Sequence, residues 1–245
     1  HNCNWSRTSC ADQAWGDGKG PTVNLQKQYD PADKRRQWVY MSDGDFYPNI
    51  NKANGGYTYH IAVVDEQGNE LESANEMLAH CKKYCIGRAA DCNGGVGDAQ
   101  DAANNIYLLR LADVYMVYVE ACIGSGDATS DALALDVYAR IRERAGLSAD
   151  ADGSITYDEL IHERRCEFAF EGINFFDIKR MFYRNQEKAL AYLNGMNREQ
   201  GYYNSDPSKK TVREGYTLDL TRALITVSAS QMYLPIPGSE LTAMP

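Results

Sequence analysis

Residues 156–180 read TYDELIHERRCEFAFEGINFFDIKR, and this stretch decides how the chain folds. Thr156 precedes Glu159 by three residues, which is the spacing of a capping box, so a helix is expected to begin there. Apolar residues then recur at helical spacing and form one face: Leu160, Ile161, Phe168 and Ala169. Gly172 is expected to end the helix, because glycine accepts the left-handed conformation that helix ends often need. We therefore predict a helix over residues 157–171.

The predicted helix carries three glutamates, Glu163, Glu167 and Glu171, each four residues from the next. Like charges at this spacing repel by about 0.2–0.5 kcal/mol per pair. The helix therefore needs basic partners, and the nearest candidates in the sequence are Arg164, Arg165, Lys179 and Arg180. An apolar run over 173–178 is expected to fold back against the helix. We expect an ion-paired helix and turn at the centre of a helical core.

Length and charge limit the class of protein. The chain has 245 residues with 44% apolar and 24% charged residues, enough for one domain with a real core. A net charge of −9 without a basic cluster argues against nucleic acid and anionic membrane surfaces as partners. No apolar run is long enough and free enough of charge to span a bilayer. The chain begins HNCNWSRTSC, without an initiator Met or signal peptide, so we expect a processed or truncated piece.

The domain spanning 1–245 is expected to have three parts: a loop-rich segment over 1–103, a helical core over 104–180, and an irregular segment with a Pro-Ile-Pro tail over 181–245. In the first part, residues 37–41 are expected to form a strand that pairs with residues 57–64 and places Trp38 in the core.

In the helical core, residues 104–145 are expected to form two long antiparallel helices joined by the turn at 124–127. The first is apolar on nearly every side and is therefore expected to be buried. Its charges must then be paired, and Arg110 with Asp113 is the local candidate. The second helix should end at Gly146.

Seven cysteines are many for a cytosolic chain: Cys3, Cys10, Cys81, Cys85, Cys92, Cys122 and Cys166. A zinc site at Cys81, Cys85 and Cys92 lacks a fourth ligand at suitable spacing. A disulfide between Cys85 and Cys92, or between Cys3 and Cys10, would suit an extracytoplasmic protein. The remaining two, Cys122 and Cys166, lie on predicted core helices and are expected to be buried free thiols.

Two motifs hint at chemistry that the sequence does not favour. Residues 148–159 fit a calcium loop through Asp150, Asp152 and Glu159, but Ser148 stands where the first carboxylate is required. An Asx-rich turn before the capping box is the preferred interpretation, so no metal or other cofactor is expected and calcium remains the alternative. The glutamate stripe could suggest glycoside hydrolysis, but neighbouring arginines lower a carboxyl pKa, whereas a general acid needs a raised one. We expect no enzyme.

Several segments resemble one family. The segment ERRCEFAFEGINFFDIKR over 163–180 resembles the ERRxEfxfEGxRxxDlxR signature of the SusD/RagB family, with Asn174 where a basic residue is usual. Further resemblances are YDPADKRRQWVY over 29–40, CKKYCIG over 81–87, LRLADVYMVYVEA over 109–121, ARIRERAGL over 139–147 and YLPIPGSELTAMP over 233–245. The chain is thus similar to the second half of a family member.

The resemblance implies a mainly α fold: a helical core with long irregular loops and minor β hairpins, without the family's tetratricopeptide-like N-terminal half. It also implies a surface lipoprotein of the outer membrane, anchored through a segment not present in this chain. Such proteins capture oligo- or polysaccharides without catalysis and deliver them to a SusC-like TonB-dependent transporter. The alternatives are a calcium-stabilised helical interaction module, or capture of peptide rather than glycan.

Sugar binding needs aromatic faces that stack on pyranose rings and polar groups at their edges. The two tryptophans of the N-terminal segment, Trp5 and Trp15, lie in a polar stretch without periodicity, so a role in the core is not indicated. The predicted ligand-binding residues are Trp5, Trp15, Asn4, Arg7, Asp12 and, more weakly, Tyr203.

Overall fold

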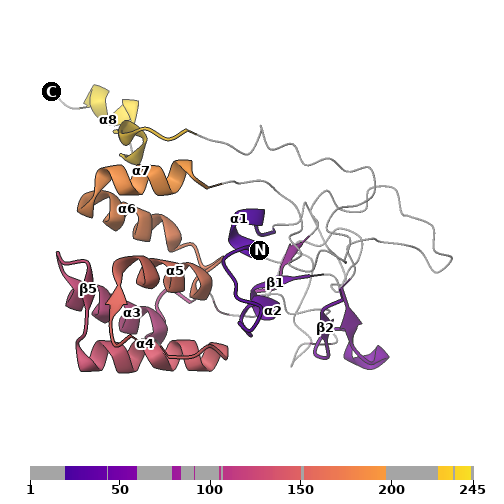
Figure 1. Cartoon of the computed structure of the whole chain (residues 1–245). Coiled ribbons are helices and arrows are strands. Elements are labelled where there is room, and N and C mark those ends of the chain that lie inside the picture. Colours follow the sequence, from indigo (N-terminus) through magenta and orange to yellow (C-terminus); the bar gives the residue numbers. More distant parts are fainter. Residues whose placement is uncertain are drawn as a thin grey trace.

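The computed structural model describes residues 20–42, 44–59, 79–83, 91, 105, 107–149, 152–196, 226–233 and 235–243. The described part is mainly helical, as expected. Its longer helices lie one above another (Figure 1), from α4 at the bottom of the view to α7 near the top. They are α3 (Leu111–Ile123), α4 (Ala132–Ala145), α5 (Tyr157–Glu167), α6 (Asn174–Arg184) and α7 (Gln186–Asn194).

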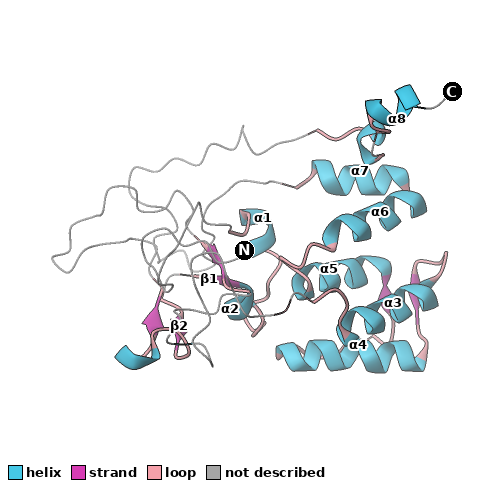
Figure 2. Cartoon of the chain, turned by 180° about the vertical axis from the view of Figure 1, so that it is seen from behind, coloured by secondary structure: helices cyan, strands magenta, loops and turns pink. Residues whose placement is uncertain are grey.

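The remaining elements are short. Four are helical turns: α1 (Val23–Gln26), α2 (Arg36–Val39), η1 (Lys52–Asn54) and η4 (Ala229–Met232), and a fifth helix, α8 (Gly238–Ala243), follows near the C-terminus. The strands are β1 (Tyr40–Met41), β2 (Phe46–Tyr47), β3 (Tyr57–Thr58), β4 (His80–Cys81), β5 (Ala128–Thr129) and β6 (Ile155–Thr156). Figure 2, seen from behind, shows α1, α2 and the first strands beside the stack of helices.

The strands form three antiparallel pairs, and the pairing differs from our prediction. β1 pairs with β4, in the register Tyr40 with Cys81, whereas β3 pairs with β2. Trp38, which we expected in a core strand, lies in α2 and is 49% exposed. Residues Arg36–Val39 form a helical turn instead of a strand. In this turn Val39 is buried and Trp38 is exposed.

Helix α5 begins as predicted and ends earlier than predicted. The capping box is confirmed: the Thr156 side chain accepts from the Glu159 amide, and the Glu159 side chain accepts from the Thr156 amide. The helix ends at Glu167 instead of residue 171, because Phe170 has already left helical geometry with a φ of +65°. Gly172, with a φ of +82°, lies in the turn that leads into α6.

The antiparallel hairpin of α3 and α4 is confirmed, although α3 starts only at Leu111. Asp131 caps the start of α4, and Gly146 ends it with a φ of +84°. Buried apolar residues from α3 to α7 and η4 form one core, which includes Met116, Ile141, Leu160, Ile178, Phe182 and Met232. A second cluster joins the N-terminal segment to α5 through Tyr29, Val39, Tyr40 and Cys166.

The prediction of a fully buried α3 is wrong for this chain. Only one side of the helix meets α4 and α5, and Met116, Val119 and Ile123 are buried there. Every exposed position of the helix is apolar: Leu111, Val114, Val117, Tyr118 and Ala121. An all-round apolar sequence therefore did not predict burial here, because the described chain packs against only one side of the helix.

The helical part extends further than residue 180, because α6 and α7 continue to Asn194. None of the described helices is long and apolar enough to cross a membrane. Among the described cysteines, Cys166 is a buried free thiol, Cys122 is a half-buried free thiol, and Cys81 is buried, with its Sγ donating to the Lys83 carbonyl. Cys3, Cys10, Cys85 and Cys92 lie outside the described residues.

Candidate functional site

The three glutamates of the α5 region are held by an ionic cluster. Glu163 contacts Arg35 and, at 3.0 Å, Arg142 Nη1. The Glu167 carboxylate forms ion pairs with Arg144 Nη2 at 2.6 Å, Arg110 Nη1 at 2.9 Å and Arg35 Nη1 at 3.1 Å. Glu171 receives Arg110 Nη2 at 2.7 Å and also contacts Lys83. The cluster thus joins α5 to the N-terminal segment, the start of α3 and the end of α4.

The prediction that these glutamates need cations is confirmed, but the predicted partners are wrong. Arg164 instead contacts Asp113 at 2.7 Å and Asp177 at 2.9 Å. The first contact is an ion pair without hydrogen-bond geometry. Consecutive helix positions point in different directions, so Arg164 cannot face its neighbour Glu163.

The other predicted partners are also occupied elsewhere. Arg180 binds Glu120 and Asp177, Arg165 donates to the Asn24 side chain, and Lys179 donates to the Met232 carbonyl. The expected Arg110–Asp113 pair is likewise absent from the described contacts. Arg110 forms ion pairs with Glu167 and Glu171, and Asp113 forms one with Arg164.

The charges of the cluster suit positioning more than proton transfer. Burial alone would raise the pKa of Glu167, whose side chain is 2% exposed, but Arg144, Arg110 and Arg35 outweigh burial and hold the pKa below its usual value. For Lys83, burial dominates and lowers the pKa despite the nearby Glu171. A carboxyl group that stays ionised is a poor general acid.

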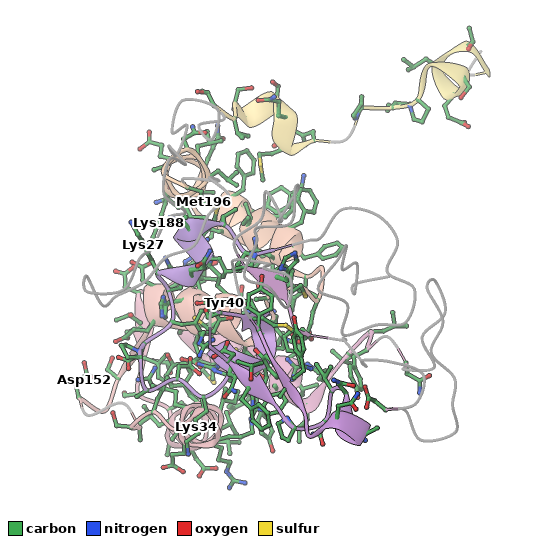
Figure 3. All side chains as sticks on the ribbon, turned by 90° about the vertical axis from the view of Figure 1, so that its right-hand side faces the viewer. Lys27, Lys34, Tyr40, Asp152, Lys188 and Met196 are labelled. Atoms are coloured by element: carbon green, nitrogen blue, oxygen red, sulfur yellow. The ribbon has the colours of Figure 1, made fainter. Side chains whose placement is uncertain are left out.

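A cavity of about 640 Å³ is lined in part by residues of this cluster. Its lining includes Trp38 and Tyr107, which are 49% and 58% exposed, and also Glu167 and Glu171. Lys34 and Arg144 add exposed cationic side chains at its edge. Lys34 is labelled in the lower part of Figure 3. Two aromatic faces next to charged hydrogen-bonding groups are the combination that sugar rings require.

The ligand-binding residues predicted from the sequence lie outside the described residues: Trp5, Trp15, Asn4, Arg7, Asp12 and Tyr203. The described residues nearest to them in the chain, Gly20 and Met196, both line a second cavity of about 320 Å³. Met196 is labelled in the upper part of Figure 3. Gly20 and Met196 therefore lie at one common cavity, although they are far apart in the sequence.

The calcium motif is only partly described, because Asp150 lies outside the described residues. Asp152 is exposed, on a turn labelled at the edge of Figure 3, and accepts a hydrogen bond from the Ser154 amide at 2.9 Å. Glu159 Oε2 is engaged in the capping box, where it accepts from Thr156 N at 2.8 Å and Thr156 Oγ1 at 2.6 Å. The residues that the structure describes contain no group of three or more potential metal ligands.

Sequence reasoning missed Trp38, Tyr107 and Lys34 as residues of a common cavity. Trp38 was assigned to the core on the strength of an expected strand, and Tyr107 to a buried helix. The available signal was the basic run over 34–36 close to a tryptophan, but only the fold places this run and Tyr107 at the same cavity.

The SusD family profile matches residues 11–245, so the chain belongs to the SusD family. A SusD-like protein of Bacteroides ovatus is 32% identical over 248 aligned residues, which cover 94% of this chain and 42% of that protein. The chain therefore spans less than half the length of this relative.

Solved structures agree with this assignment. A crystal structure with xylogluco-oligosaccharide is 30% identical at a TM-score of 0.70, and covers 91% of this chain and 44% of its own. A second crystal structure with the same identity and coverage gives a TM-score of 0.72. Surface glycan-binding protein A from Bacteroides uniformis is 18% identical at a TM-score of 0.52, covers 96% of this chain and 44% of its own, and shares the fold. The resemblance to the SusD/RagB family and the mainly α fold are confirmed.

Proposed function

We propose that this chain belongs to a non-catalytic glycan-binding protein of the bacterial cell surface. The observation that carries the proposal is the cavity of about 640 Å³ with Trp38 and Tyr107 on its walls. Its volume falls within the range of about 300–1,000 Å³ that is usual for ligand pockets. The xylogluco-oligosaccharide in a crystal structure that is 30% identical supports a glycan as the ligand.

The charges that line the cavity support binding without catalysis. Glu167 is held ionised by three arginines, so it lacks the raised pKa that a glycosidase acid requires. The role of the cluster is to fix the walls of the cavity, since it ties Arg35, beside Trp38 in the N-terminal segment, to Arg110, which follows Tyr107 closely in the chain.

Calorimetric titration with xyloglucan-derived oligosaccharides tests the proposal. We expect Trp38→Ala and Tyr107→Ala to weaken binding by about 1–3 kcal/mol each, the loss of a stacking anchor. Tyr183→Ala is the matched control, because Tyr183 is exposed on α6 and does not line the cavity. Unchanged affinity in both cavity variants would contradict this location of the site.

The N-terminal segment supplies a second set of proposed contacts, to which Tyr203 of the 181–245 segment is added: Trp5, Trp15, Asn4, Arg7, Asp12 and Tyr203. Loss of binding in Trp5→Ala or Trp15→Ala, with Trp38→Ala unchanged, would move the site toward these residues. A large loss of thermal stability with unchanged affinity would instead identify the two tryptophans as packing residues.

Membership of the SusD family supports a place at the outer membrane and a SusC-like TonB-dependent transporter as the partner. In this proposal the full-length protein is lipid-anchored and passes the captured glycan to the transporter. Antibody labelling of intact cells tests the location, and co-purification of the transporter with the full-length protein tests the partnership. A protein reached by antibody only after cell lysis would contradict surface exposure.

A further inference from the structure

The larger cavity carries an excess of positive charge. Two carboxylates and five cationic side chains line it: Glu167 and Glu171 with Lys34, Arg35, Lys83, Arg110 and Arg144. Outside the lining, Arg35 also pairs with Asp33 and Glu163. Glu163 in turn pairs with Arg142, so that six cations accompany four carboxylates. The excess is opposite in sign to the net charge of −9 of the whole chain, so an anion is attracted to this cavity more than to the surface at large.

Three of the five cations are engaged by the glutamates of the cluster. Arg35 and Arg110 both donate to Glu167, at 3.1 and 2.9 Å. Arg110 Nη2 donates to Glu171 at 2.7 Å, and Lys83 also pairs with Glu171. The charge of these three cations is compensated within the fold, so they position the lining and contribute little to the attraction of a ligand.

Lys34 and Arg144, the other two cations, keep donors that the fold does not use. The ammonium of Lys34 is exposed and makes no hydrogen bond or ion pair with the described residues. Arg144, whose side chain is 58% exposed, donates to Glu167 through Nη2, while its Nε and Nη1 make no hydrogen bond within the described part of the chain. Charged donors of this kind form the stronger class of hydrogen bonds with a carboxylate.

The end of α4 holds these two cations next to each other. The Lys34 amide donates to the Ala145 carbonyl at 2.8 Å, which places Lys34 beside the last residues of the helix. The Lys34 side chain then crosses Gly146 so closely that a Cβ on this glycine would lie 2.9 Å from Lys34 Cε. Gly146 therefore ends the helix and also leaves room for the lysine stem, so the position of both cations is built into the fold.

The aromatic side chains of the cavity complete the chemistry that an acidic sugar needs. Trp38 and Tyr107 line the same cavity and are about half exposed, so their rings are open to the C–H face of a sugar. A uronate ring has such a face and adds a carboxylate at its edge. The neutral part of the ligand thus has aromatic partners, and its charge has Lys34 and Arg144.

We propose that the larger cavity prefers an acidic glycan, one whose sugar units carry carboxylates, and that Lys34 and Arg144 bind the carboxylate. The inference rests on glycan binding as the proposed function and adds a class of glycan to it. The available donors and the local excess of positive charge carry it.

Calorimetric titration of the whole chain with tetragalacturonate and with its full methyl ester tests the inference. The ester keeps every sugar ring and removes the negative charge. We expect tetragalacturonate to bind at least about tenfold more tightly than the ester, because hydrogen bonds between charged groups are stronger than neutral ones. The preference should shrink at high salt, since both cations are exposed and therefore screened. Equal affinities of the two probes at low salt would overturn the inference.

Lys34→Glu locates the preference in the cavity. The ammonium takes part in none of the described ion pairs, so its loss leaves the cluster intact, while the new carboxylate repels the ligand. We expect the ratio of the two affinities to fall toward one, with Lys34→Gln between this variant and the unmodified chain. An unchanged ratio in Lys34→Glu would overturn the inference.

Lys27→Glu is the matched control. It makes the same change of net charge on an exposed lysine at the end of α1, which does not line the cavity and is labelled apart from Lys34 in Figure 3. This variant should keep the preference for tetragalacturonate. An equal loss in Lys27→Glu and Lys34→Glu would assign the preference to the net charge of the chain and overturn the inference.

Titration with a neutral xyloglucan oligosaccharide separates this inference from the proposed function. Trp38→Ala should weaken binding of the neutral glycan and of tetragalacturonate, because both stack on the same ring. If the neutral glycan binds and depends on Trp38, but tetragalacturonate binds no better than its ester, only the inference fails. If tetragalacturonate binding depends on Lys34 while Trp38→Ala affects no glycan, the proposed stacking site fails and the carboxylate site stands.

Discussion

Helices α5 and α3 differ in burial, and the difference is the opposite of what their sequences suggest. Helix α5 is rich in charge, yet Glu163, Arg164 and Glu167 are all nearly inaccessible to solvent. Helix α3 is rich in apolar residues, yet Leu111 is 63% exposed and Val114 and Val117 are about half exposed. The two helices contact each other, so the contrast arises within one core.

The contrast teaches that burial in this fold follows ionic pairing as well as hydrophobicity. The two buried carboxylates of α5, Glu163 and Glu167, meet cations from distant segments, which offsets much of the cost of removing the charges from water. The outer face of α3 has no such partner segment among the described residues, and its apolar side chains stay at the surface. Substitutions that remove the ion pairs of α5, or the apolar side chains of α3, test this explanation.

The largest effect is expected from Glu167→Gln, which leaves Arg35 and Arg110 without their shared carboxylate. Removing one partner from a buried ionic group costs about 3–5 kcal/mol of folding free energy, and urea denaturation would measure it. Asp136→Asn is the control, since the pair of Asp136 with Arg140 is exposed and should contribute less than about 1 kcal/mol. Equal losses in the two variants would show that the cluster adds nothing through burial.

Acid should weaken the same contacts. The pKa of Glu167 is lower in the folded chain than its usual 4.5, so the unfolded chain binds the proton more readily. The stability that Glu167 contributes is therefore fully present above about pH 4.5 and is lost as pH falls through its folded pKa. The free energy of unfolding, measured against pH, should fall less steeply in Glu167→Gln; an unchanged slope would contradict this linkage.

A smaller difference separates the starts of the two helices. Helix α5 opens with the capping box of Thr156, whereas Arg110, at the start of α3, makes no side-chain cap bond. We expect Thr156→Ala to destabilise the chain by about 1 kcal/mol, with Thr156→Ser close to the unmodified chain. A thermal melt in which serine fails to rescue would show that the threonine methyl, not the cap, provides the stability.

The exposed face of α3 should tolerate polarity. Leu111→Gln is expected to change the free energy of unfolding by no more than about 0.5 kcal/mol, as for other exposed positions. Met116→Ala, on the buried side of the same helix, should cost about 2–5 kcal/mol. Similar costs at the two positions would mean that the outer face is covered in solution.

The smallest effect is expected from calcium. With Ser148 at the first ligand position and Glu159 engaged in the cap of α5, a chelator should leave the melting temperature unchanged. A calcium-dependent rise that disappears in Asp152→Asn would promote the alternative of a calcium-stabilised module. Asp152 is the better position for this test, because a change at Glu159 would also remove the cap.

The sequence by itself determined the local features of this protein. It placed the capping box at Thr156, the hairpin of α3 and α4 and its end at Gly146, and the need for cations around three glutamates. These features depend on residues within a few positions of one another, where helix geometry fixes which side chains meet. The motifs around Glu163 and Arg180 also pointed to the SusD family, which the profile match confirms.

The tertiary structure alone decided which partners meet. Arg35 reaches Glu163 across 128 positions of the chain, and Lys83 reaches the end of α5 across more than 80, so no local spacing could reveal either contact. The same holds for Trp38 and Tyr107, which share a cavity although they lie far apart in the sequence. The charge or hydrophobicity of a residue indicates which kind of partner stabilises it, whereas the packing of distant segments decides whether that partner is present. For that reason the charged helix α5 is buried here and the apolar helix α3 is half exposed.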